Sequence, residues 1–223
     1  MILLIIFSPC MIPAINALGS KGFILTYGGL LGDNILTDIA FSPKLTDSAL
    51  FCVGFGSKLL ENKHYVRLEW EGQLVRHWGQ NKFTCSCSSC GDPGFGWAPG
   101  ESYEKSRDIQ TIYYNEMNAL LVLRWLKFPL ERWIDINFAA GEGISYDTKV
   151  PPKEVDPHSV NHGYVYDTSK WLNYLMFELT FALPRYPAWS CFYRVHHRSG
   201  DFGLINGVAN GSNFLGVGIR YDF

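Results

Sequence analysis

Hydrophobic and polar residues alternate with a period of two along most of the chain. Such alternation predicts β-strands with one buried face, because successive side chains of a strand point to opposite sides. Segments with this pattern cover residues 22–32, 47–60, 63–77, 111–126, 132–147, 170–183, 188–199 and 213–223. The sequence therefore predicts an all-β protein with eight strands.

The two faces of these segments differ in an informative way. In "YVRLEWEGQL", Leu68 and Trp70 share one face, whereas Arg67 and Glu69 share the other. Across the strands the polar rows carry both signs of charge, on Arg67, Glu69, Glu116, Arg124, Asp135, Glu178 and Arg194. Large apolar side chains opposite paired charges are typical of a barrel that turns its apolar face to lipid and its polar face inward. Eight strands enclose an interior that side chains fill, which argues against a pore.

The connections between the segments alternate in length. Short links such as "ENK" and "PRYP" follow every second strand, whereas the other strands are followed by 33–46, 78–110, 148–169 and 200–212. Outer-membrane barrels have short periplasmic turns and longer extracellular loops. We therefore expect an eight-stranded antiparallel up-and-down transmembrane β-barrel in a Gram-negative outer membrane, with long extracellular loops at 78–110 and 148–169.

Composition and the N-terminal segment agree with this location. The formal net charge is -2 and charged residues make up only 18%, so no basic excess indicates nucleic acid. Residues 1–17 are mostly apolar and end at Ala17, which predicts a signal peptide followed by a barrel over 18–223. The rest of the chain contains no apolar run of the length that a transmembrane helix needs.

Three cysteines crowd into the segment "TCSCSSC". The spacing of Cys85, Cys87 and Cys90 is compatible with a metal site or with a loop disulfide. No fourth ligand lies close by in the sequence, and an oxidising compartment favours the disulfide. We therefore expect no metal or other cofactor here.

The segment "HHRSG" near the end of the seventh strand carries the candidate chemistry. Alternation places His197 and Ser199 in the lipid-facing row and Arg198 in the lumen, at the extracellular end of the wall. A serine hydroxyl becomes a nucleophile when a neighbouring imidazole takes its proton. This pair predicts hydrolysis of an ester in a lipid of the outer leaflet.

The next strand and the connecting loop offer the supporting groups. Asn213 begins the eighth strand on the same face, where it can orient the imidazole of His197 in place of a carboxylate. Backbone amides around Gly200 and Gly203 are candidate donors to an oxyanion.

The segment "HHRSGDFG…NG…GSNFLGVGIRYDF" resembles the lipid A 3-O-deacylases of the PagL type, an acyloxyacyl hydrolase-like family of outer-membrane barrels. The resemblance implies removal of the ester-linked acyl chain at position 3 of lipid A, with Ser199 as nucleophile and His197 as base. Lipopolysaccharide, other outer-membrane lipids and the barrel-assembly machinery, which reads a final aromatic such as Phe223, are the implied partners. A homodimer is compatible with such a barrel.

Two positions depart from this family. Its Asn directly after the Ser is Gly200 here, and its downstream Glu has no counterpart, since Gly211, Ser212 and Asn213 occupy that region. The alternative is a non-catalytic outer-membrane barrel with a structural or surface-binding role through its long loops. A shared fold does not fix an activity.

Overall fold

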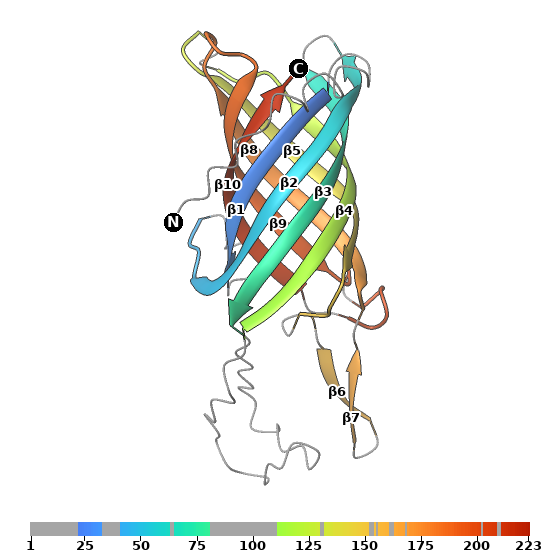
Figure 1. Cartoon of the computed structure of the whole chain (residues 1–223). Coiled ribbons are helices and arrows are strands. Elements are labelled where there is room, and N and C mark those ends of the chain that lie inside the picture. Colours follow the sequence, from blue (N-terminus) through green and yellow to red (C-terminus); the bar gives the residue numbers. More distant parts are fainter. Residues whose placement is uncertain are drawn as a thin grey trace, which may run out of the picture.

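Eight antiparallel strands close into a barrel in the computed structural model of the chain, and a separate hairpin lies beyond one end (Figure 1). The structure describes residues 22–32, 41–62, 65–80, 111–129, 132–151, 154, 156–160, 163–167, 169–201, 203–208 and 211–223. The barrel strands are β1 (Gly22–Gly32), β2 (Leu45–Asn62), β3 (Val66–Gln80), β4 (Thr111–Trp125), β5 (Asp135–Asp147), β8 (Trp171–Ala182), β9 (Trp189–Ser199) and β10 (Gly211–Asp222). Neighbours in sequence pair with each other, and β1 pairs with β10 to complete the ring.

All eight predicted strands are confirmed, with ends that differ by up to three residues. The third strand extends to Gln80, so the loop expected at 78–110 begins after it. The expected loop 148–169 contains strands that the sequence pattern did not predict, namely β6 (Asp156–Val160) and β7 (Gly163–Asp167). The predicted signal peptide, residues 81–110 and their three cysteines lie outside the described residues.

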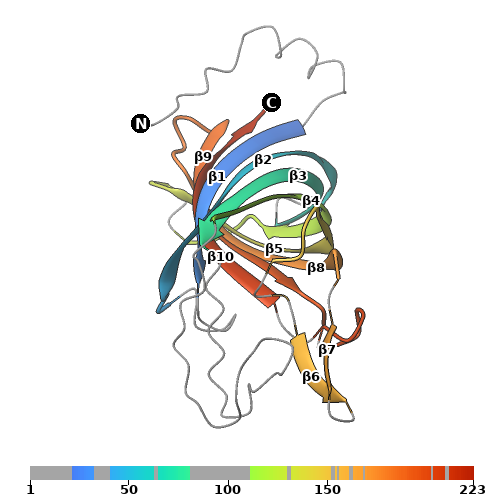
Figure 2. The same ribbon diagram turned by 60° about the horizontal axis from the view of Figure 1, so that its bottom comes forward.

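Both ends of the barrel sequence meet on the side of the short turns. The Phe223 N–H donates to the Gly22 carbonyl at 3.0 Å, which continues the β1–β10 ladder to the last residue. The β6–β7 hairpin lies at the opposite end (Figure 2). The end that carries the hairpin is therefore the extracellular end of an outer-membrane barrel, and the end near Phe223 is periplasmic.

The outer wall is apolar. Leu74, Leu121, Ile144 and Val217 are each more than half exposed, as lipid-facing side chains would be. Exposed aromatic residues gather at both ends of the wall. The periplasmic girdle consists of Tyr65, Trp125, Trp133, Tyr186 and Trp189, and the extracellular girdle of Trp78, Tyr113 and Trp171. An apolar band between two aromatic girdles matches a membrane-spanning barrel, so the chain is an outer-membrane protein.

Among the described residues, no helix has the length and hydropathy that crossing a membrane requires.

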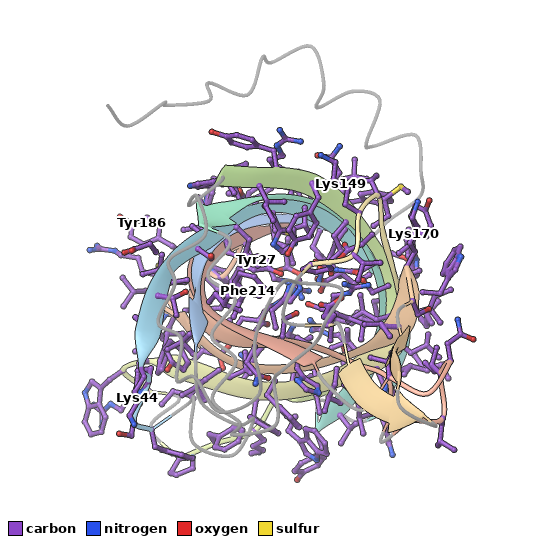
Figure 3. The ribbon with its side chains drawn as sticks, turned by 90° about the horizontal axis from the view of Figure 1, so that it is seen from below. Tyr27, Lys44, Lys149, Lys170, Tyr186 and Phe214 are labelled. Atoms are coloured by element: carbon purple, nitrogen blue, oxygen red, sulfur yellow. The ribbon has the colours of Figure 1, made fainter. Side chains whose placement is uncertain are left out.

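The interior is filled with side chains, as predicted. Seen from the extracellular end, Tyr27 and Phe214 lie inside the ring of strands, whereas Lys44 and Tyr186 lie outside it (Figure 3). The interior is not only ionic, because one side of it holds an apolar cluster of Phe23, Leu25, Tyr27, Leu50, Cys52, Val75, Phe192 and Phe214. A second apolar cluster on β4, β5 and β8 consists of Leu120, Val122, Ala139, Tyr174 and Met176. The buried charges divide into a periplasmic and an extracellular group.

Candidate functional site

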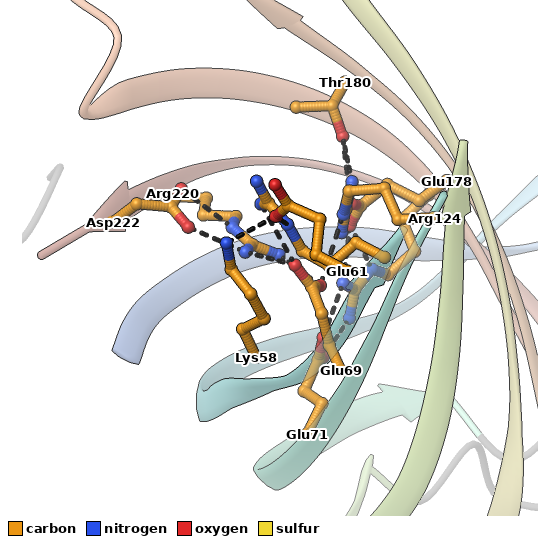
Figure 4. A network of polar contacts seen from close by, with 11 residues as sticks. Lys58, Glu61, Glu69, Glu71, Arg124, Glu178, Thr180, Arg220 and Asp222 are labelled. Atoms are coloured by element: carbon orange, nitrogen blue, oxygen red, sulfur yellow. Dashed lines mark hydrogen bonds and ion pairs between the residues drawn. The ribbon is translucent and has the colours of Figure 1, made fainter. Parts of the chain in front are cut away.

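The periplasmic group of buried charges is balanced. It contains the carboxylates of Glu69, Glu71 and Glu178 and the guanidiniums of Arg124, Arg194 and Arg220. Figure 4 shows five of these side chains close together in the lumen, those of Glu69, Glu71, Arg124, Glu178 and Arg220. With Arg194 of β9, the group comes from five strands. Three negative and three positive groups neutralise one another, which is the condition for keeping charges in a dry interior.

Arg194 connects two carboxylates within this group. Its Nη1 donates to Glu71 Oε1 at 2.6 Å, and its Nε donates to Glu178 Oε2 at 2.8 Å. The guanidinium carbon lies 5.2 Å from the ring centre of Tyr27 and 5.0 Å from that of Phe192. This side chain is completely buried, so it ties β9 to β3 and β8 across the barrel.

The extracellular group has a different composition. Arg198 Nη1 contacts both Asp147 Oδ2 and Glu154 Oε2, the latter at 2.6 Å. Ser212 Oγ donates to Glu154 Oε1 at 2.7 Å. Glu154 lies in the loop after β5, and burial raises the pKa of its carboxyl group above the usual range, although Arg198 acts in the opposite direction.

Below this group, two imidazoles meet one carboxylate. His77 Nε2 lies 2.6 Å from Glu116 Oε2, and His196 Nε2 lies 3.1 Å from Glu116 Oε1. His196 Nδ1 contacts the hydroxyl of Tyr27 at 2.7 Å and that of Tyr174 at 3.2 Å. All of these side chains are buried in the lumen, so they cannot touch a lipid outside the wall.

The predicted pair of His197 and Asn213 forms on the outer wall. The residues face each other across β9 and β10, and His197 Nδ1 lies 2.6 Å from Asn213 Oδ1. Because the amide oxygen accepts, Nδ1 carries the proton and Nε2 keeps its lone pair. An imidazole held in this tautomer can act as a base at Nε2. The expected contact is therefore confirmed, while its catalytic role stays a prediction.

Ser199 occupies the last rung of β9, on the same face as His197. Its backbone is in register with Asn173 of β8 and Gly211 of β10. The side chain is partly exposed, and among the described residues no hydrogen bond joins it to His197. Hydrogen bonds between catalytic groups are often long before substrate binds, so this separation is compatible with the predicted pair.

The structure adds a carboxylate that the sequence pattern did not single out. Asp201 follows the strand in a left-handed conformation with φ of 51°, and its Oδ1 accepts a hydrogen bond from Asn173 Nδ2 at 3.1 Å. The carboxylate is close enough to His197 to interact with it electrostatically. The sequence signal for this carboxylate is its position two residues after Ser199. Alternation did not reveal it, because the strand pattern does not extend into a turn.

The loop after β9 is held by its own backbone. The Gly203 N–H donates to the Val208 carbonyl at 3.1 Å, and the Ile205 N–H donates to the Gly200 carbonyl at 3.0 Å. The Gly203 amide is thus already engaged, which removes it from the expected oxyanion donors in this conformation. A Cβ on Gly200 would lie 2.0 Å from the Val208 oxygen. This close approach explains why glycine follows Ser199.

Comparisons with known proteins found only remote structural likeness. No family model matches the chain, and no curated protein matches it. Among solved structures, it is similar to the outer membrane enzyme PagL, with 9% identity, a TM-score of 0.48 and coverage of 89% of this chain and 98% of that chain. Neisserial surface protein A is similar at 10% identity, with a TM-score of 0.47 and coverage of 92% and 98%. The barrel domain of Pseudomonas aeruginosa OprF is similar at 8% identity, with a TM-score of 0.39 and coverage of 91% and 97%.

These proteins are an enzyme, a surface protein and a barrel domain, and all are remote in sequence. Likeness at such identities concerns the barrel alone and carries no argument about chemistry.

Proposed function

We propose that the protein is an outer-membrane ester hydrolase that removes an acyl chain from lipid A in the outer leaflet. Ser199 is the nucleophile and His197 is the base, and Asn213 orients the imidazole. The observation that supports this proposal most directly is the 2.6 Å contact between His197 Nδ1 and Asn213 Oδ1 on the lipid-facing wall. It leaves Nε2 free to take a proton from an adjacent hydroxyl.

The position of the site supports the substrate class. His197 and Ser199 lie at the extracellular end of the wall, beyond its apolar band and near exposed polar residues such as Glu142, where ester groups of outer-leaflet lipids are found. An acyl chain can lie along the apolar wall while its ester carbonyl reaches the end of β9. In the reaction, Ser199 Oγ adds to the carbonyl carbon, His197 takes the hydroxyl proton, and the sugar oxygen leaves with a proton. Water then releases the fatty acid from the serine ester.

Asp201 supplies a nearby negative charge. When His197 becomes an imidazolium, the carboxylate of Asp201 stabilises it, because the two groups interact electrostatically. In this proposal Asp201 and Asn213 together replace the glutamate of the PagL-type enzymes.

The test is mass spectrometry of lipid A from a Gram-negative host that expresses the full chain. The wild type should remove one ester-linked acyl chain, whereas Ser199→Ala and His197→Gln should lower the rate at least roughly 10³-fold, as loss of a nucleophile or base does. Ser57→Ala is the matched control, since Ser57 is an outward hydroxyl at the periplasmic end, bonded to Trp70 Nε1 at 2.6 Å. Equal amounts of the wild type and each variant in the outer-membrane fractions make their rates comparable. An acyl pattern identical to that of cells without the protein would refute the proposal.

One observation favours a second function, binding at the cell surface. The β6–β7 hairpin extends beyond the barrel on the extracellular side (Figure 1). A barrel that binds through this hairpin should lose binding at the cell surface when residues 156–167 are deleted, and it should keep that binding in Ser199→Ala. The opposite result supports the hydrolase.

A further inference from the structure

The extracellular group of buried charges is out of balance, in contrast to the periplasmic group. Among the described residues it contains three buried carboxylates, those of Glu116, Asp147 and Glu154, and a single buried guanidinium, that of Arg198. The other titratable side chains here are the imidazoles of His77 and His196 and the buried hydroxyl of Tyr114. A proton on Glu154, whose pKa is raised, reduces the excess of negative charge. Glu116 lies 4.0 Å from the Arg198 guanidinium, so the two imidazoles are its nearer partners.

Three ligand-type side chains converge around the Glu116 carboxylate. His77 from β3, Glu116 from β4 and His196 from β9 place one nitrogen or oxygen each within 4.8 Å of one another. Both imidazoles turn Nε2 toward the carboxylate, at 2.6 Å for His77 and 3.1 Å for His196. Ligand atoms around a tetrahedral Zn²⁺ lie about 3.4 Å apart, given bond lengths near 2.1 Å. Small side-chain rotations therefore bring these atoms to coordination distance.

The surroundings hold each ligand in place. The ring of His77 stacks on Tyr114 at 4.3 Å between ring centres and with an interplanar angle of 4°. Glu116 Oε1 accepts a hydrogen bond from Ser145 Oγ at 3.0 Å. His196 Nδ1 contacts two tyrosine hydroxyls. A hydrogen-bond partner on one imidazole nitrogen orients the ring, so these contacts direct Nε2 toward a metal.

We propose that His77, Glu116 and His196 form a binding site for one divalent transition-metal ion such as Zn²⁺ inside the barrel. Two imidazoles and a carboxylate are ligands that such ions prefer. The ion adds positive charge beside the Glu116 carboxylate and joins β3, β4 and β9. It is a structural site, separate from Ser199 and His197, because the barrel wall lies between them.

The experiment uses the full chain without a polyhistidine tag, refolded into detergent micelles with or without ZnCl₂ or CoCl₂ and then washed with a chelator. We expect about one equivalent of metal to remain on the folded wild type, and the Co²⁺ form to show the intense visible absorption of a tetrahedral site. His77→Gln and His196→Gln should each lower the affinity by more than roughly 100-fold, beyond the effect of losing an outer-shell partner. Loading should also raise the unfolding temperature of the wild type and leave that of both variants unchanged.

The chain contains its own control. The double variant His158→Gln and His162→Gln removes the histidines of the segment "DPHSVNH" and should retain the metal. If an imidazole variant does not fold, Glu116→Gln keeps the size of the ligand and removes its charge. Folded wild type that retains no metal would overturn the proposal. Binding that survives in His77→Gln and His196→Gln would overturn it as well.

Discussion

Replacement of Arg194 by leucine tests whether the lumen network stabilises the barrel. In Arg194→Leu, Glu178 keeps its contact with Arg124 at 2.8 Å, but Glu71 is left with the amide of Gln73 at 2.7 Å as its only described side-chain donor. A buried carboxylate without its cation destabilises a protein by roughly 3–5 kcal/mol. We expect the free energy of unfolding to fall by about 4 kcal/mol, which is close to a 1,000-fold change in the folding equilibrium.

The assay is urea unfolding in lipid vesicles, followed by tryptophan fluorescence. Arg67→Leu is the matched control, because Arg67 is 23% exposed at the periplasmic rim and its ion pair with Glu61 at 2.9 Å should contribute no more than about 1 kcal/mol. The double variant Arg194→Leu and Glu71→Leu should recover about half of the loss, since it removes the unpaired charge together with its partner. A loss in Arg194→Leu no larger than in Arg67→Leu would contradict the reasoning.

Three other predictions concern the outer site and the extracellular end. Asn213→Asp gives His197 a carboxylate partner and should raise kcat/KM for lipid A at least roughly tenfold, as measured by acyl release in micelles; an unchanged rate would argue against an orienting role. Gly200→Ala brings a Cβ to 2.0 Å from the Val208 oxygen, so we expect a loss of about 1–3 kcal/mol in urea unfolding, and equal stability would show that the loop can open. Because the folded-state pKa of Glu154 is raised, the native state binds the extra proton, and stability should fall by up to about 1.4 kcal/mol per pH unit as pH rises above 4.5. Glu154→Gln should flatten this dependence, and parallel pH curves for the two proteins would exclude Glu154 as its source.

The barrel could be predicted from the sequence because its two environments differ so strongly. Successive residues of a strand face lipid and the packed lumen in turn. The alternation between apolar and polar side chains, such as Leu68 and Glu69, therefore continues along whole strands. Strand ends were less well defined. The third strand continues to Gln80, because its pairing with β4 extends beyond the membrane-embedded part of the wall. Only within that part must the outer face be apolar.

Contacts across the barrel and within turns could not be predicted in the same way. Glu116 and His196 lie on β4 and β9, and no periodicity indicates that they meet in the lumen. Asp201 reaches Asn173 because its backbone adopts a left-handed turn. The apolar cluster around Tyr27 was missed for a related reason, since aromatic residues on inward rows look like interruptions until the closed ring brings them together.

The tetrapeptide His196–Ser199 shows how one strand can serve two sites at once. His196 and Arg198 point into the lumen, where they contact Glu116 and Asp147, whereas His197 and Ser199 point to the lipid side. A shift of the strand by one residue would exchange the two sets, placing the proposed catalytic pair in a dry interior and the side chains of His196 and Arg198 against acyl chains. The lumen contacts of His196 and Arg198 therefore fix the register that presents the outer pair. It follows that weakening the lumen contacts should disturb the outer site even though the barrel wall separates them, and that the reverse should not hold.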